Sequence, residues 1–193
     1  QLLGYVNTKA MAVRVMLQNH KSQDAEQHLL QLEQASRELF TDVRETILGL
    51  DMSRDDGLLL ADALEEYAYH FNRFSGSPVE TEISSEARAL MLPSETELHL
   101  LRIVQEALTN VRKHASASRA VVKVSLEDQS LLVTVGDNGA GFDPDDPSGN
   151  GHSQFGLRTM RERAEAIGAA FQVKSKPGSG TQIAVRVDLS KEP

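Results

Sequence analysis

The sequence contains no cysteine and no tryptophan, and only 5% of its 193 residues are aromatic. The lack of cysteine excludes disulfide bonds, thiolate metal sites and a cysteine nucleophile. No apolar run is long enough to cross a bilayer, and no signal peptide opens the chain. The net charge of −8 argues against general attraction to nucleic acid. We therefore expect a cytoplasmic region that binds no nucleic acid and reaches a membrane only through a segment upstream, if at all.

Residues 1–50 carry two amphipathic patterns that predict a helical hairpin. The first pattern runs from Leu2 to about Asn19, and a polar turn from His20 to Asp24 follows it. The second places Leu32, Ala35, Leu39, Val43, Ile47 and Leu50 on one side of a helix. Two helices cannot enclose a core, so the apolar stripes need a partner. The near-heptad spacing favours a second copy and a dimeric four-helix bundle. The alternative is that the hairpin packs on its own chain.

Residues 51–57 break the helical pattern and predict a linker, after which residues 58–193 form a second unit. Helices are expected over 58–74, 93–115 and 156–167, with Ser94 and Glu97 as an N-capping pair. Strands are expected over 79–84, 120–126, 131–135, 171–175 and 181–189. Consecutive hairpins imply a largely antiparallel sheet with helices on one face. The chain is therefore an α+β protein, with a helical hairpin followed by a two-layer α/β sandwich.

One line of polar residues stands out on the helix predicted over 93–115. At about 100° per residue, Glu106, Asn110 and Lys113 share a narrow face. Leu101, Val104, Leu108, Val111 and Ala115 form the opposite, apolar face. Asparagine in mid-helix is mildly unfavourable, and its amide oxygen could be a ligand for Mg²⁺. Glu106 could ligate the same ion or support it, although the pair could equally be solvated surface chemistry.

Asp137 begins a glycine-rich segment directly after a predicted strand. A carboxylate at a strand end can accept a hydrogen bond from the amine of adenine, whereas guanine presents a carbonyl there. Gly139 and Gly141 allow the backbone to approach a ligand closely. An ordinary Asp-Asn-Gly turn is the alternative. A long loop is expected over 138–153, where functional loops often lie.

Two further glycine motifs follow. Gly151 to Arg163 opens a helix with a glycine-rich stretch, an arrangement that suits phosphate binding. Gly180-Thr181 precedes the last strand and by itself is only a hairpin turn. The chain has no Gly-x-x-x-x-Gly-Lys-Ser/Thr run, which excludes a P-loop site. The Gly-x-Gly-x-x-Gly rule for dinucleotide-binding sites does not apply either, because the expected sheet is not parallel.

Taken in order, these motifs resemble those of sensor histidine kinases. Glu106 to His114 is similar to the N box, Asp137 to Gly141 to the first glycine box, Gly151 to Leu157 to the second, and Gly180-Thr181 to the terminal element. Met160-Arg-Glu-Arg-Ala164 resembles the nitrate/nitrite-sensor subfamily, whose partners are LuxR-type response regulators. The resemblance implies a Bergerat-type ATP-binding fold and autokinase activity, with phosphate passing from a histidine to a receiver-domain Asp.

The resemblance also assigns roles to individual residues. It implies that Asp137 binds adenine, that Asn110 ligates Mg²⁺ with Glu106 beside it, and that Lys113 and His114 lie near the phosphates of ATP. The implied nucleotide-binding set further contains Gly139, Gly141, Gly151, Phe155, Gly156, Leu157 and Thr181. Residues 139–155 would form a mobile lid.

One feature departs from the family pattern. The subfamily's phospho-accepting His stands in a His-Asp/Glu pair on the first bundle helix, and neither His20 nor His28 is followed by an acid. We therefore expect the acceptor to precede Gln1. Two other functions compete: an ATPase or serine kinase of the same fold, which would lack the hairpin, and a dimeric adaptor that no longer binds ATP. The presence of Asp137 and Asn110 favours the kinase.

Overall fold

The computed structural model describes residues 2–19, 21–33, 36, 59–75, 78–144 and 151–190. The chain divides into two compact units, Gln1–Leu48 and Gly49–Pro193. No helix among the described residues is both long and apolar enough to span a membrane.

The first unit contains a helix pair, as the apolar spacing predicts. Helix α1 spans Leu2–Gln18, and a second helix occupies residues 22–33. The second helix begins at Ser22, inside the predicted turn from His20 to Asp24. Lys9 reaches across and donates a hydrogen bond from Nζ to Oε1 of Gln31, at 2.9 Å. Of the second helix's predicted apolar positions, Ala35, Leu39, Val43, Ile47 and Leu50 lie outside the described residues, as does the linker 51–57.

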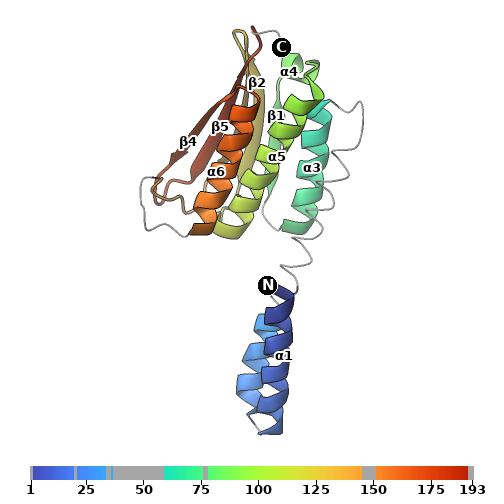
Figure 1. Cartoon of the computed structure of the whole chain (residues 1–193), viewed down its shortest axis with the longest axis vertical. Helices are drawn as coiled ribbons and strands as arrows, with labels where there is room; N and C mark the ends of the chain where they lie inside the picture. The colour runs from blue at the N-terminus through green and yellow to red at the C-terminus, as the bar shows by residue number, and fades with distance from the viewer. Residues whose placement is uncertain are drawn as a thin grey trace. The chain divides into compact units, whose positions relative to one another are not determined.

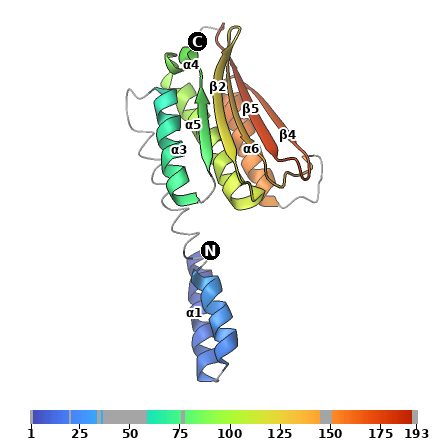
Figure 2. The same ribbon diagram turned by 180° about the vertical axis from the view of Figure 1, so that it is seen from behind.

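The second unit is a two-layer sandwich in which helices cover one face of a five-stranded sheet (Figure 1; Figure 2, from behind). The helices are α3 (Leu60–Ser75), α4 (Ser85–Arg88), α5 (Ser94–Asn110) with its π-helical continuation η1 (Val111–Ala115), and α6 (Gly151–Ala166). The strands are β1 (Val79–Ile83), β2 (Ala120–Glu127), β3 (Ser130–Asp137), β4 (Ala170–Ser175) and β5 (Thr181–Asp188). The α+β class and the five strands are confirmed.

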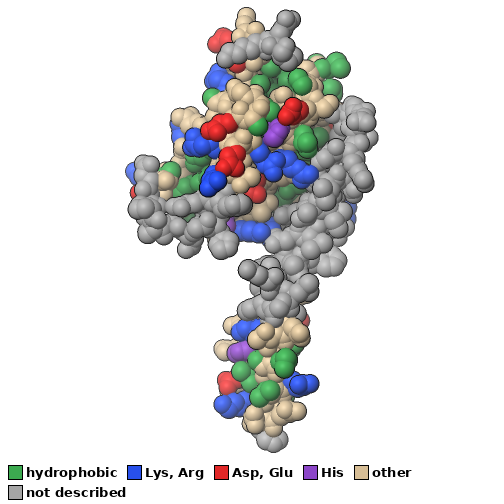
Figure 3. All heavy atoms as spheres, viewed as in Figure 1, with side chains coloured by type: hydrophobic (Ala, Val, Ile, Leu, Met, Phe, Trp, Pro, Cys, Tyr) green, Lys and Arg blue, Asp and Glu red, His purple; other side chains and the backbone are tan. Residues whose placement is uncertain are grey.

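The strands lie in the order β1-β2-β3-β5-β4, and only the β1–β2 pair is parallel. Alternate residues of the central strands face the helices and are buried, among them Val122, Val133, Val135 and Val185. The apolar face predicted for α5 is buried against them: Leu101, Val104, Leu108, Val111 and Ala115 are each at most 9% exposed. The outer surface of the helix layer is rich in charged side chains (Figure 3).

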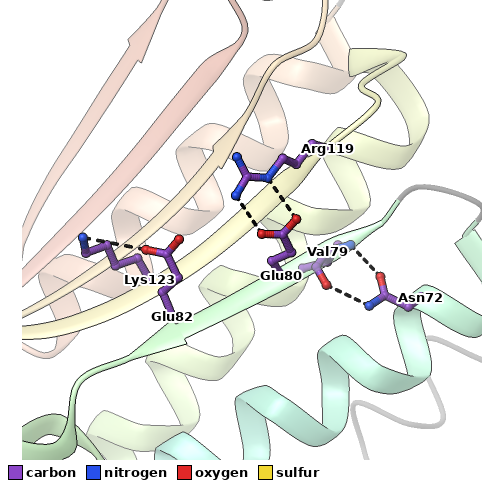
Figure 4. Close-up of polar contacts among 6 residues, drawn as sticks. All are labelled: Asn72, Val79, Glu80, Glu82, Arg119 and Lys123. Atoms are coloured by element: carbon purple, nitrogen blue, oxygen red, sulfur yellow. Dashed lines mark hydrogen bonds and ion pairs between the residues drawn. The ribbon is translucent and has the colours of Figure 1, made fainter.

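The edge strand β1 is held by polar contacts as well as by the core (Figure 4). The Asn72 side chain of α3 donates to the Val79 carbonyl at 2.8 Å and accepts from the Val79 amide at 2.6 Å. On the face away from the helices, Arg119 makes a two-pronged contact with Glu80. That contact lowers the pKa of the Glu80 carboxyl. Asn72 thus ties β1 to α3, and Arg119, which precedes β2, ties β1 to its parallel neighbour.

Two local predictions about helix ends are wrong. The N-cap of α5 is Pro93, without a side-chain cap, and Ser94 is the first helical residue. The Glu97 carboxylate instead accepts hydrogen bonds from the backbone amides of Leu60 and Leu92. Burial raises the pKa of Glu97 by more than these two bonds lower it. Helix α6 starts at Gly151 rather than at Gly156, so the loop after β3 is shorter than predicted. The one-turn helix α4 was not predicted.

Candidate nucleotide site

The C-terminal half of α5 brings Glu106 and Asn110 against Gly156 of α6. A Cβ placed on Gly156 would lie 2.5 Å from Glu106 Oε1 and 3.2 Å from Asn110 Nδ2. Gly156 therefore leaves the space into which both side chains project. Both are partly exposed, and their oxygens are the hard donors that Mg²⁺ prefers. The described residues hold no group of three or more His, Asp or Glu side chains that could enclose a metal.

Beyond Asn110 the helix widens into the π-helical turn η1, which ends at Ser116 in the left-handed conformation, with φ 48°. The angle per residue is smaller here than in an α-helix, which changes the position of Lys113 around the helix axis relative to Glu106 and Asn110. Lys113 and His114 are exposed on this turn. Single π-helical turns are rare in helices and occur frequently at functional sites.

Asp137 is the last residue of β3 and lies on the same side of the sheet as the buried Val133 and Val135. Its Oδ1 accepts the Gly139 amide at 2.7 Å, and the Thr181 amide also donates to the carboxylate. Burial raises the pKa of Asp137, and the two amide bonds lower it by less. The carboxylate is therefore half-buried and short of solvent, and it can accept a further hydrogen bond from a ligand.

The loop after β3 packs tightly on both neighbours. The Ala140 amide donates to the Ala115 carbonyl at 2.7 Å, and a Cβ on Gly139 would collide with that same carbonyl. On the other side, the Gly178 amide donates to the Ala140 carbonyl at 2.6 Å. The loop thus connects the end of η1 to the β4–β5 hairpin. The backbone of this loop therefore joins the end of η1 to Asp137.

Gly141 and Gly180 are required by both conformation and space. Their φ angles are +59° and +72°. A Cβ on Gly141 would collide with the carbonyls of Lys176 and Gly180, and one on Gly180 would collide with the Asp137 carbonyl. Only glycine combines that backbone region with so close an approach.

The structure adds two polar residues that the sequence motifs did not single out. Asn138 accepts at Oδ1 from the amides of Ser118 and Arg119, at 3.1 and 3.0 Å, and holds the start of β2 beside Asp137. Ser175 contacts Phe142, Gly180 and Thr181 through its hydroxyl. Ser175 could have been found from the sequence only with the exact hairpin register, which places it opposite Thr181.

The remaining predicted residues lie on α6. Gly151 and Phe155 belong to its first five residues, whose side chains are outside the described part of the structure. Leu157 is partly buried and packs against the core, so its role includes ordinary packing. Residues 145–150 of the expected lid also lie outside the described residues.

A cavity of about 580 Å³ opens at the Asp137 end of the sheet. Its lining includes Val121, Gly136, Gln182 and Lys174, which alternate with the buried residues of their strands. These four residues face away from the helix layer. Asp137, Ser175, Gly180 and Thr181 also line the cavity, so it adjoins the Asp137 carboxylate.

Residues 95–191 match the sequence pattern of the family described as histidine kinase-, DNA gyrase B- and HSP90-like ATPase. The chain belongs to this family. The motifs identified above therefore lie in an ATPase domain of known type, and the matched segment covers half of the chain. The sensor-kinase resemblance stated from the motifs is consistent with this membership.

Individual relatives agree with the family. The sensor protein VraS of Staphylococcus aureus (strain COL) is 39% identical over 114 residues, which are 59% of this chain and 32% of that protein. The match thus spans about a third of that relative. Two solved structures share the fold. The histidine kinase domain of the Erythrobacter litoralis EL346 blue-light activated histidine kinase has a TM-score of 0.58 at 24% identity, covering 97% of this chain and 96% of that one. The Acinetobacter baumannii histidine kinase AdeS has a TM-score of 0.55 at 13% sequence identity, covering 97% of this chain and 98% of that one.

Proposed function

We propose that the chain is the dimerisation and ATP-binding part of a sensor histidine kinase, in which residues 1–50 form half of a dimeric bundle and residues 58–193 bind ATP. The observation that carries the proposal is the half-buried carboxylate of Asp137 beside the backbone of Gly139 and Thr181. Family membership and the similarity to a sensor protein support it. The finer proposal, from the motif at Met160 to Ala164, is a LuxR-type response regulator as partner.

In this proposal, the chain's own residues act mainly by positioning. Asp137 accepts a hydrogen bond from the exocyclic amine of adenine. Thr181 provides a second polar contact beside that amine. Asn110 and Glu106 are the residues that would hold Mg²⁺, which supplies charge neutralisation at the phosphate oxygens when bound. Lys113 and His114 stand on the π-helical turn next to them and add positive charge or hydrogen-bond donors near the phosphates. Phosphoryl transfer needs little covalent chemistry from the protein beyond such placement.

Autophosphorylation tests the proposal in a chain extended upstream to include a His-Asp/Glu pair. We expect γ-labelled ATP to place acid-labile label on that histidine. Gly156→Ala should abolish labelling because its Cβ would displace Glu106 and Asn110. The same change should leave the melting temperature equal or higher, since alanine favours a helix over glycine by roughly 1 kcal/mol. Label on serine or aspartate, or full activity in the Gly156 variant, would contradict the proposal.

A further inference from the structure

Ser175 completes a row of three polar residues across neighbouring strands. Asp137 of β3 pairs with Thr181 of β5, and Thr181 pairs with Ser175 of β4. All three side chains are partly buried. Asp137 and Thr181 carry the adenine contact in the proposed function. Thr181 therefore lies between Asp137 and Ser175 in the sheet.

The Ser175 hydroxyl makes three polar contacts. It accepts the Phe142 amide at 2.9 Å, because an amide can only donate. It lies 3.0 Å from the Gly180 carbonyl oxygen, which can only accept, so the single Ser175 proton goes there. The third contact, 2.9 Å to Thr181 Oγ1, must then be donated by Thr181. Counting protons therefore fixes the direction of the whole chain of hydrogen bonds.

The direction of this chain decides what Thr181 can offer a ligand. Its only hydroxyl proton is used on Ser175, so Thr181 Oγ1 presents lone pairs alone. Asp137, when ionised, likewise presents only acceptors. Two acceptors side by side match a ligand that donates, such as the 6-amino group of a purine. They oppose the carbonyl that guanine carries at that position.

We propose that Ser175 is a specificity-determining positioning residue: it fixes the polarity of the Thr181 hydroxyl and thereby strengthens the preference for a 6-amino over a 6-oxo purine nucleotide. The inference rests on the proposed function, in which this site binds the adenine of ATP. In this proposal Ser175 acts through its hydrogen bond with Thr181. Without the serine hydroxyl, Thr181 is released to rotate and to donate to a carbonyl.

Calorimetric titration with ADP and with GDP tests the inference. In Ser175→Ala the ratio of ADP to GDP affinity should fall about fivefold, the value of one neutral hydrogen bond. Ser175→Thr retains the hydroxyl and should keep the parent ratio. Ser125→Ala, a matched change on β2, should also leave the ratio unaltered. In a Thr181→Val background, Ser175→Ala should have no further effect on the ratio, because the group it acts through is gone.

Several results would overturn the inference. A Ser175→Ala protein that loses affinity for both nucleotides equally, with its ratio unchanged, would show a structural role only. If the alanine variant does not fold, Ser175→Cys fills the same space with a much weaker hydrogen-bonding group, and an unchanged ratio in that variant is equally contradictory. A parent chain that binds neither nucleotide would overturn the proposed function together with this inference. Parent binding with an unaltered ratio in the variants would overturn the inference alone.

Discussion

At the scale of single residues, the protonation state of Asp137 links the fold to the ligand. Burial raises the pKa of its carboxyl above the ordinary value of 3.8. The ionised form is the one that can accept a hydrogen bond from an amine without offering a proton. Ligand affinity and folding stability therefore respond to this carboxyl in opposite directions.

We predict that ADP affinity falls on acidification at a higher pH than an ordinary aspartate would give.

A raised pKa also means that the charged carboxylate costs folding free energy at neutral pH, and that this cost disappears as pH falls through the raised value. Asp137→Asn should therefore be more stable than the parent at neutral pH, and the difference should vanish in acid. Melting temperatures of both proteins across a pH series provide the measurement. A stability difference that grows as pH falls would contradict the account.

At the scale of elements, the β4–β5 hairpin is held against β3 by backbone contact that only glycine permits. Gly178 and Gly180 have similar positive φ angles, +78° and +72°. A Cβ on Gly178 meets nothing within 4 Å, whereas one on Gly180 collides with the Asp137 carbonyl. The two positions therefore separate backbone strain from collision.

We predict that Gly178→Ala costs about 1 kcal/mol of folding stability, the penalty for a left-handed alanine. Gly180→Ala should cost several kcal/mol more, or displace β3 from the hairpin and abolish nucleotide binding. Denaturant unfolding of both variants measures the difference. Equal losses at the two positions would show that the close approach of Gly180 to Asp137 is not important.

The elements also show what the sequence could and could not predict. All five strands follow from apolar alternation, because one face of each central strand is buried. The predicted Ser94 cap is wrong, and the Glu97 carboxylate bonds to the backbone of Leu92 and Leu60 instead. The Leu60 bond is a tertiary contact that no local pattern predicts. The π-helical turn and the role of Ser175 depend equally on contacts between distant segments. The places of the motif residues on α5 and at the end of β3 were predictable, since they depend on local helix and strand patterns.

At the scale of the whole molecule, the described part of the first unit buries few of its apolar side chains. Among its described residues, only Val13 and Ala25 are buried hydrophobics. Large apolar side chains that stay exposed are Met11, Val15, Leu17, Leu29 and Leu30, each between 49% and 61%. Exposed apolar side chains on a helix pair are typical of a surface that another chain covers.

We predict that the chain is a dimer in solution and that Val15→Glu shifts it to a monomer, because a charge on this face opposes burial. Met91→Glu is the matched control. Met91 is 83% exposed in the second unit, and the same change there should leave the dimer intact. Light scattering over a concentration series measures the molar mass. A parent protein that remains monomeric at every concentration would contradict the proposal that residues 1–50 form a dimer.

The central claim is that this chain binds Mg·ATP at Asp137, and calorimetry tests it most directly. We expect the parent chain to bind Mg·ATP with one site per chain. The Asp137→Asn variant should lose at least tenfold in affinity, since the amide places a donor where the amine of adenine needs an acceptor. Folding of the variant is checked by its melting temperature. No binding by the parent, or equal binding by a folded variant, would contradict the account.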